Sequence, residues 1–178
     1  MKMLRCGICG ETYLGSETPS HCPFCGAHRE HIVPAPEYPA QINQVQPTEI
    51  ERNDLESAIE LERDNTRFYL GMATHTDDHV LASAYKRLAK IEAEHCELFC
   101  ELANLSKPDD LSIPLDVPDD WCANIAESVE RERRASRLYR EFATRATNAR
   151  IAEVFEAVSA VESDHIELDG LAFAYRGC

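Results

Sequence analysis

The strongest constraint on the fold is an internal repeat that fills the chain from residue 54 onward. Many residues recur 70 positions later, and apolar positions keep their character at the same offset, as Leu88 and Val158 do. The identical pairs include Glu60/Glu130, Glu62/Glu132, Arg63/Arg133, Tyr69/Tyr139, Glu92/Glu162 and His95/His165. Self-similarity at one fixed offset indicates two copies of one structural unit.

Each copy has the composition of a helical hairpin. From Asp54 onward the chain is rich in Ala, Glu, Leu and Arg, with interruptions at residues 74–78, 107–120 and 147–149. Four helices are therefore predicted. If both hairpins are antiparallel, residues 107–118 must cross the length of the bundle, and about 40 Å of extended chain suffices for a helix of about 37 Å. Asp119 or Asp120 supplies the next helix start.

The repeat places carboxylates on stripes that are otherwise apolar. Glu62 interrupts a core-facing row that includes Leu55 and Ile59, and Glu132 does the same in the second copy. The second helix of each hairpin adds a Glu-x-x-His pair, so the candidate ligands are Glu62, Glu92, His95, Glu132, Glu162 and His165. One such pair alone is more often a solvated helix face, but two copies at one offset indicate metal. Bare burial of four carboxylates would be prohibitive, whereas a charge of about −4 matches two divalent cations. The prediction is a di-iron or di-manganese site.

Glu60 is repeated too, but it lies about 200° around the helix from Glu62. It shares a row with Arg63 and Arg67. We expect a surface salt-bridge ladder or an interface there, and no metal ligand.

The N-terminal segment carries two C-x-x-C-G elements, which contain Cys6 and Cys9, then Cys22 and Cys25. Four sulfurs at this spacing suit tetrahedral zinc or iron, and spacing alone leaves the two metals at even odds. The predicted organisation is a metal module at 1–33, a proline-rich linker at 34–47 that runs extended and exposed, and the bundle at 48–178.

The other histidines and cysteines near these sites receive no chemical role. His21, His28 and His31 are expected to be exposed loop residues, because four sulfurs already satisfy the metal. Cys96 and Cys100 are expected to be small core residues, and they and Cys122 and Cys178 are predicted to be free thiols.

The formal net charge of −14 disfavours binding to nucleic acid and to anionic membranes. No apolar run approaches the length of a membrane helix, and the first residues lack the apolar core of a signal peptide. We therefore expect a cytoplasmic protein, in which clustered cysteines bind metal instead of forming disulfides.

The two motifs carry a family resemblance. C-x-x-C-G-x-x-Tyr with Tyr13, followed by C-P-x-C-G, resembles the rubredoxin domain of rubrerythrins. The helical part resembles the ferritin-like superfamily, in which a Glu is followed seven residues later by Tyr, as in Glu62/Tyr69 and Glu132/Tyr139. The resemblance implies a ferritin-like four-helix bundle with a di-iron centre and iron in the four-cysteine module. It also implies that Glu92 and Glu162 bridge the metals, that Glu62 and Glu132 are terminal ligands, and that both tyrosines lie near the cluster.

For function, the resemblance implies reduction of hydrogen peroxide to water, with electrons relayed from the cysteine module and supplied by an external donor. One departure matters: typical rubrerythrins carry an additional Glu one turn after the third-helix ligand, whereas Ala135 follows Glu132 and Asn65 follows Glu62. The site therefore resembles the symmetric, six-ligand centre of bacterioferritin. Two alternatives stay open: a ferroxidase that handles iron itself, and a di-metal oxidase, using oxygen, whose cysteine module holds structural zinc.

The extended linker also suggests that the two sites of one chain lie too far apart for fast electron transfer. We therefore expect an antiparallel homodimer in which the cysteine module of one subunit approaches the di-iron site of the other.

Overall fold

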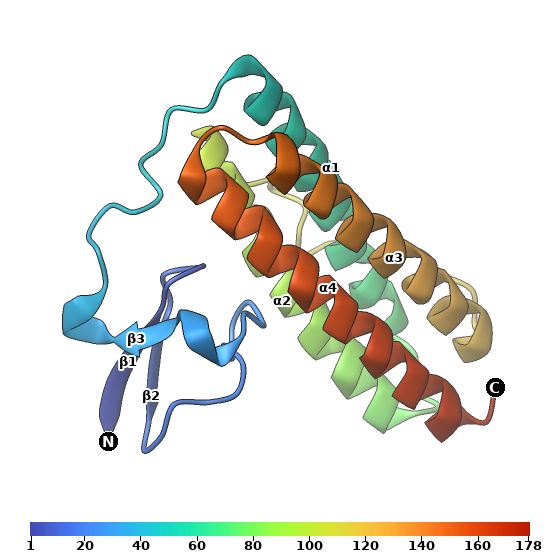
Figure 1. The fold of residues 1–178 in the computed structure, drawn as a ribbon. Helices are drawn as coiled ribbons and strands as arrows, with labels where there is room; N and C mark the ends of the chain where they lie inside the picture. The colour runs from blue at the N-terminus through green and yellow to red at the C-terminus, as the bar shows by residue number, and fades with distance from the viewer.

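The computed structural model describes residues 1–178, which form a small sheet domain beside a bundle of long helices (Figure 1). The strands are β1 (Lys2–Cys6), β2 (Thr12–Gly15) and β3 (Ile32–Pro34), with 3-10 turns at Arg29–His31 and Ala35–Glu37. The helices are α1 (Glu49–Met72), α2 (His79–Ala103), α3 (Trp121–Arg145) and α4 (Ala149–Arg176). The predicted fold class, a four-helix bundle with a small N-terminal module, is confirmed.

Local signals explain where each helix begins. Asp78, Asp120 and Asn148 are the N-caps of α2, α3 and α4, and each side chain accepts hydrogen bonds from backbone N–H groups of the first turn. The first helix begins at Glu49, earlier than the expected Asp54, because Thr48 and Glu51 form a capping box. Figure 1 shows two antiparallel hairpins, α1–α2 and α3–α4, with α2 and α3 parallel.

The crossover between α2 and α3 runs along α1. Arg63 and Arg67 both form ion pairs with Asp110, and Leu115 N donates to the backbone oxygen of Arg67 at 2.9 Å. Gly71 leaves room for this close approach, since a Cβ there would collide with the Leu115 backbone. The expected ladder is wrong for Glu60, which forms no ion pair because the two arginines bind the crossover instead. In the second copy Glu130 does pair with Arg133, at 2.7 Å, and the alternative of an interface stays a prediction.

The module is a three-stranded antiparallel sheet in the order β2-β1-β3, with Leu4 opposite Tyr13 and Pro34. The segment 34–47 differs from the exposed, extended run that we expected. It contains a 3-10 turn and buries Asn43 and Val45. Hydrogen bonds hold this segment against the bundle: Asn43 accepts from Arg150 of α4 at 2.9 Å and donates to Glu101 of α2 at 2.8 Å.

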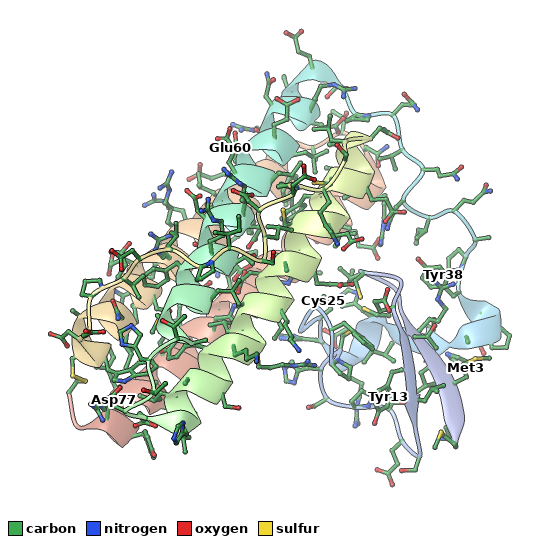
Figure 2. The ribbon with its side chains drawn as sticks, turned by 180° about the vertical axis from the view of Figure 1, so that it is seen from behind. Met3, Tyr13, Cys25, Tyr38, Glu60 and Asp77 are labelled. Carbon is green, nitrogen blue, oxygen red and sulfur yellow. A yellow bond between two sulfur atoms is a disulfide. The ribbon has the colours of Figure 1, made fainter.

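The module packs against the bundle of its own chain. Arg150 Nη2 donates to the backbone oxygen of Ile8 at 2.7 Å, and a Cβ on Gly26 would lie 2.7 Å from Val161 Cγ1 on α4. Figure 2 shows Cys25 at the edge of the module that faces the helices. The expectation that the linker holds the two sites of one chain apart is therefore wrong, because the folded segment 34–47 brings the module back onto α2 and α4. The homodimer stays a prediction, without this argument for cross-subunit pairing.

Two of the four remaining cysteines correct the prediction of free thiols. Cys122 and Cys178 form a disulfide, with Cα atoms 5.7 Å apart, because the end of α4 returns to the start of α3. Cys96 and Cys100 are free and buried in the core, as expected. No helix has the length and apolar character needed to cross a membrane.

Candidate metal centres

The six residues predicted from the repeat come together in the middle of the bundle. Glu62 lies on α1, Glu132 on α3, and the two Glu-x-x-His pairs on α2 and α4. The four glutamates and His95 have no exposed surface, and His165 is 6% exposed. The packing of the two hairpins thus turns a linear repeat into one cluster.

The cluster has two halves that share two carboxylates. Ligand atoms of Glu62, Glu92, His95 and Glu162 lie within 4.8 Å of one another, as do those of Glu92, Glu132, Glu162 and His165. His95 Nδ1 is 3.2 Å from Glu162 Oε1, and His165 Nδ1 is 3.0 Å from Glu92 Oε1. Glu92 and Glu162 therefore stand where bridging ligands would, and Glu62 and Glu132 stand at the two ends.

The residues fit a pair of metal ions because their polar atoms lack other partners. Buried atoms without a hydrogen bond include Glu62 Oε2, Glu92 Oε1 and Oε2, Glu132 Oε2, Glu162 Oε1 and His95 Nδ1. Uncompensated carboxylate oxygens in a core are costly, and two divalent cations would satisfy them together. The donor set of carboxylate and imidazole suits iron, manganese or zinc.

The electrostatics of the bare cluster point the same way. Burial, and then the charges of Glu162 and Glu92, raise the pKa of Glu62 well above its usual value, and burial with the same two neighbours raises that of Glu132. Burial alone would lower the pKa of His95, but the nearby carboxylates of Glu162 and Glu92 outweigh it and raise the pKa to about 10. Without cations the cluster thus holds extra protons, which metal binding would displace.

The two tyrosines cross between the hairpins. Tyr139 Oη, on α3, donates to Glu62 Oε1 on α1 at 2.5 Å, and Tyr69 Oη, on α1, donates to Glu132 on α3. Ser128 Oγ in turn donates to Tyr69 Oη at 3.0 Å. Each terminal carboxylate is therefore oriented by a phenol from the other repeat, which is how the surroundings of a metal site orient its ligands.

The four cysteines of the module form a compact cluster. The Sγ atoms of Cys6 and Cys25 are 3.7 Å apart, and those of Cys9 and Cys22 are 3.8 Å apart. A tetrahedral site with metal–sulfur bonds of about 2.3 Å requires sulfur separations of about 3.8 Å. Gly10 and Gly26 have φ of 82° and 76° and close the two knuckles through hydrogen bonds to the backbone oxygens of Cys6 and Cys22. The arrangement therefore fits a single metal ion.

One hydrogen bond connects the two sites directly. His95 Nε2 lies 2.8 Å from the backbone oxygen of Cys25. Because a carbonyl oxygen can only accept, Nε2 carries a proton, and Nδ1 is the nitrogen that faces the carboxylates and would bind a metal ion. A ligand of the cysteine site is thus linked through its own backbone and one hydrogen bond to a residue of the bundle cluster.

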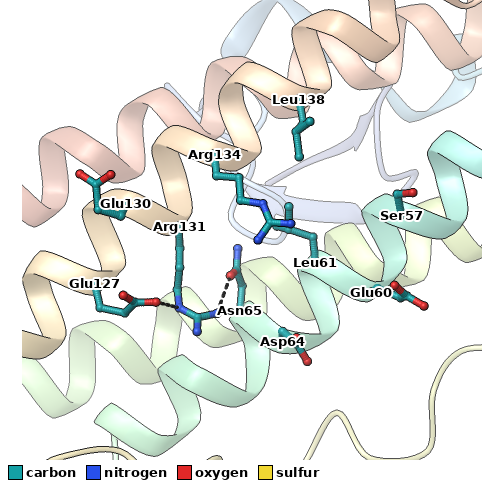
Figure 3. Close-up of a pocket in the computed structure, with 10 residues that line it drawn as sticks. All are labelled: Ser57, Glu60, Leu61, Asp64, Asn65, Glu127, Glu130, Arg131, Arg134 and Leu138. Atoms are coloured by element: carbon teal, nitrogen blue, oxygen red, sulfur yellow. Dashed lines mark hydrogen bonds and ion pairs between the residues drawn. The ribbon is translucent and has the colours of Figure 1, made fainter.

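A hollow of about 510 Å³ lies between α1 and α3, the helices that carry Glu62 and Glu132 (Figure 3). Asn65 is 1% exposed; its Oδ1 accepts from Arg131 at 3.3 Å and its Nδ2 has no partner. Figure 3 shows the Asn65 amide pointing into this hollow. Ala135, the other place without the additional glutamate, is fully buried in the core.

Sequence reasoning missed a polar pair beside the cluster. Tyr85 Oη donates to Asp169 Oδ1 at 2.8 Å, and burial raises the pKa of Asp169 to about 6. Asp169 lies one turn after His165 on the inward face of α4, so a carboxylate at that spacing was the available signal. The equivalent position of the first repeat is Phe99, so Asp169 is not a repeated residue and the repeat gives no signal for it.

Known proteins resemble both parts of this arrangement. Residues 5–32 match the family described as "Rubrerythrin, rubredoxin-like domain". The chain is 30% identical to Reverse rubrerythrin-1 of Clostridium acetobutylicum over 155 residues, which cover 81% of this chain and 80% of that protein. No solved structure matches the chain. Since a relative at this identity is matched over 81% of the chain, and residues 5–32 match the rubredoxin-like domain of the same family, this chain belongs to the rubrerythrin family.

Proposed function

We propose that this rubrerythrin-type oxidoreductase reduces hydrogen peroxide to water at a di-iron centre in the bundle and draws the electrons from iron in the cysteine module. The observation that carries the proposal is the 2.8 Å contact between His95 Nε2 and the backbone oxygen of Cys25. It gives electrons a short route of covalent bonds and one hydrogen bond between the two sites. A purely structural module would not require such a contact.

The ligands proposed for the centre are Glu62, Glu92, His95, Glu132, Glu162 and His165, with Cys6, Cys9, Cys22 and Cys25 at the module site. Two bound ferrous ions would supply the two electrons that convert one peroxide and two protons into two water molecules. Two tyrosines of the chain stabilise the negative charge of the terminal carboxylates. Tyr139 and Tyr69 donate to the terminal carboxylates, and burial together with the nearby carboxylates keeps the pKa of both phenols well above the usual value. They therefore remain protonated donors.

The test is to reduce the iron-loaded protein without oxygen and to mix it rapidly with hydrogen peroxide or with oxygen. We expect faster oxidation by peroxide, followed by the visible absorption of oxidised iron–thiolate at the module. The variant His95→Gln removes the imidazole, which is both a proposed iron ligand and the partner of the Cys25 backbone oxygen. It should lose rapid oxidation of the module. Faster oxidation by oxygen, with little response to peroxide, would overturn the proposal.

The identity of the metal in the module distinguishes a module that transfers electrons, which requires iron, from a module whose metal only stabilises its fold, for which zinc suffices. We expect one iron per module, with the absorption of oxidised iron–thiolate. A colourless oxidised protein with one zinc per chain would favour the di-metal oxidase with an external reductant. Metal analysis of a Cys9→Ser variant assigns the metal to this site, because the bundle ligands are untouched.

The hollow between α1 and α3 favours ferroxidase activity as the second candidate. Four acidic side chains line it against two arginines: Glu60, Asp64, Glu127 and Glu130 face Arg131 and Arg134. An acidic hollow between α1 and α3, the two helices that carry Glu62 and Glu132, would attract ferrous ions. Under this candidate the protein oxidises many Fe²⁺ per chain when oxygen is supplied, and Glu60→Gln with Glu130→Gln slows that reaction. Oxidation that stops at the iron of the two centres would exclude it.

A further inference from the structure

A third cluster of metal-ligating side chains lies where the module meets α4, outside both centres. It consists of His21 and His28 from the module and Asp164 from α4, whose ligand atoms lie within 4.8 Å of one another. His28 Nε2 is 2.6 Å from Asp164 Oδ2, and His21 Nε2 is 3.5 Å from the same oxygen. Three donors thus converge from two parts of the fold that are more than 130 residues apart in sequence.

The backbone builds this convergence. His21 and His28 face each other across an isolated antiparallel bridge that flanks the second cysteine knuckle, and their rings lie 5.0 Å apart at an angle of 86°. Asp164 stands between Glu162 and His165 on α4 but points the other way, since its side chain is 40% exposed. The cluster therefore does not share ligand atoms with the bundle centre.

The outer nitrogens of both imidazoles also have polar neighbours. His21 Nδ1 lies 3.0 Å from Ser20 Oγ, and His28 Nδ1 lies 3.9 Å from Glu30 Oε1. A bound ion would displace the proton that His28 Nε2 donates to the Asp164 carboxylate, and the Ser20 hydroxyl offers His21 Nδ1 a partner for its own proton. A hollow of about 220 Å³ beside His28 is lined by Glu30, Glu153 and Glu156 and would concentrate cations at the cluster.

We propose that His21, His28 and Asp164 bind a divalent transition-metal ion such as Zn²⁺ or Fe²⁺, which fastens the module to α4. Two imidazoles and one carboxylate select borderline metals over Ca²⁺ and Mg²⁺, which prefer all-oxygen sites. Bonds of about 2.0–2.1 Å need donors about 3.3 Å apart, so the ion requires only a small widening of the His28–Asp164 contact. A bound ion would hold the module in the position that makes the His95–Cys25 contact.

The test uses the full chain with both iron centres loaded and Zn²⁺ as the probe, in equilibrium dialysis with analysis of zinc and iron. We expect one added zinc per chain without loss of iron. His21→Ala and His28→Ala should each weaken zinc binding by at least about tenfold. The control is His79→Ala, an exposed histidine at the start of α2 that belongs neither to the cluster nor to the hollow beside it, and this variant should bind zinc as the parent does.

A second measurement separates a metal site from a plain ion-pair latch. Zinc should raise the Tm of the parent and of His79→Ala but not that of His21→Ala, a surface change that leaves the 2.6 Å His28–Asp164 contact in place. Absence of an added zinc, or full zinc binding by His21→Ala, would overturn the proposal. Either result leaves the peroxide experiment unaffected, because that experiment needs no third metal.

Discussion

At the scale of single residues, helical periodicity combined with the 70-residue repeat was enough to choose the six cluster residues. It placed Glu62 on an inward stripe and Glu60 outside it, and the structure leaves Glu62 fully buried. Helical periodicity could not predict the hydrogen-bond partners of Tyr69 and Tyr139. Each tyrosine lies seven residues after a glutamate of its own helix but bonds the glutamate of the other repeat. Periodicity within one helix says which face a residue occupies, not which neighbouring side chain meets it there.

The phenol of Tyr139 can be tested against a matched tyrosine. Tyr139→Phe should weaken Fe²⁺ binding at the bundle by about tenfold, because Glu62 loses the donor that orients it. Tyr85→Phe is the control: that tyrosine is equally buried, but it donates to Asp169 instead of a proposed ligand. Anaerobic titration of the metal-free proteins with Fe²⁺ measures both. Equal affinities in the two variants would mean that the Tyr139 bond is only structural.

At the scale of elements, turn and capping signals predicted the breaks between helices to within a few residues. The start of α1 was placed too late because its signal, Thr48 and Glu51, lies in a polar stretch without apolar periodicity. Glu51 also binds the turn between α3 and α4, since the backbone N–H groups of Thr147 and Asn148 each donate to its carboxylate at 2.7 Å. One carboxylate thus caps α1 and fixes the turn into α4, a link that no local pattern reveals.

This carboxylate predicts a pH dependence of stability. Burial alone would raise the pKa of Glu51, but hydrogen bonds from Thr48, Asn148 and Thr147 outweigh it and lower the pKa to about 2. A lowered folded-state pKa stabilises the fold above the unfolded value near 4.3, and this contribution is lost as the pH falls from there toward 2. Allowing for solvent screening, Glu51→Gln should lower the free energy of unfolding by about 2 kcal/mol at pH 7.

Urea unfolding at pH 7, 5 and 3 measures this effect, and the difference between Glu51→Gln and the parent should shrink at pH 3. Glu49→Gln, an exposed change in the same helical turn, is the control and should change stability little at any pH. A difference of constant size across this range would show that the substitution acts through packing and not through the charge.

At the scale of the whole molecule, the bundle and the module followed from the sequence separately, but their docking did not. The module contacts α2 and α4 through Arg150, Gly26, His28 and the backbone of Cys25. These contacts join residues more than 60 positions apart and recur in no repeat, so neither spacing nor composition signals them. The prolines of 34–47 suggested an open spacer, whereas the buried amide of Asn43 joins that segment to the bundle.

Docking can be weakened without replacing a ligand of either proposed metal site. Arg150 is 8% exposed and donates to Ile8 in the module and to Asn43 in the linker. Arg150→Met keeps the length of the side chain, removes both bonds and leaves two buried oxygens without this donor. We expect the bundle centre to react with peroxide at the parent rate, while oxidation of the module slows at least about tenfold because electron transfer weakens steeply with distance.

Arg176→Met is the matched control, because Arg176 lies on the same helix and binds Asp77 at the end remote from the module. Rapid mixing of reduced protein with peroxide, followed at the iron–thiolate absorption, gives both rates. The dependence of the module's oxidation rate on protein concentration distinguishes electron transfer within one chain from transfer between subunits. A rate independent of protein concentration at high dilution fits transfer within one chain, as the His95–Cys25 contact requires. A rate that falls on dilution would instead restore the pairing of one subunit's module with the other's bundle, since only a dimer that dissociates loses that route.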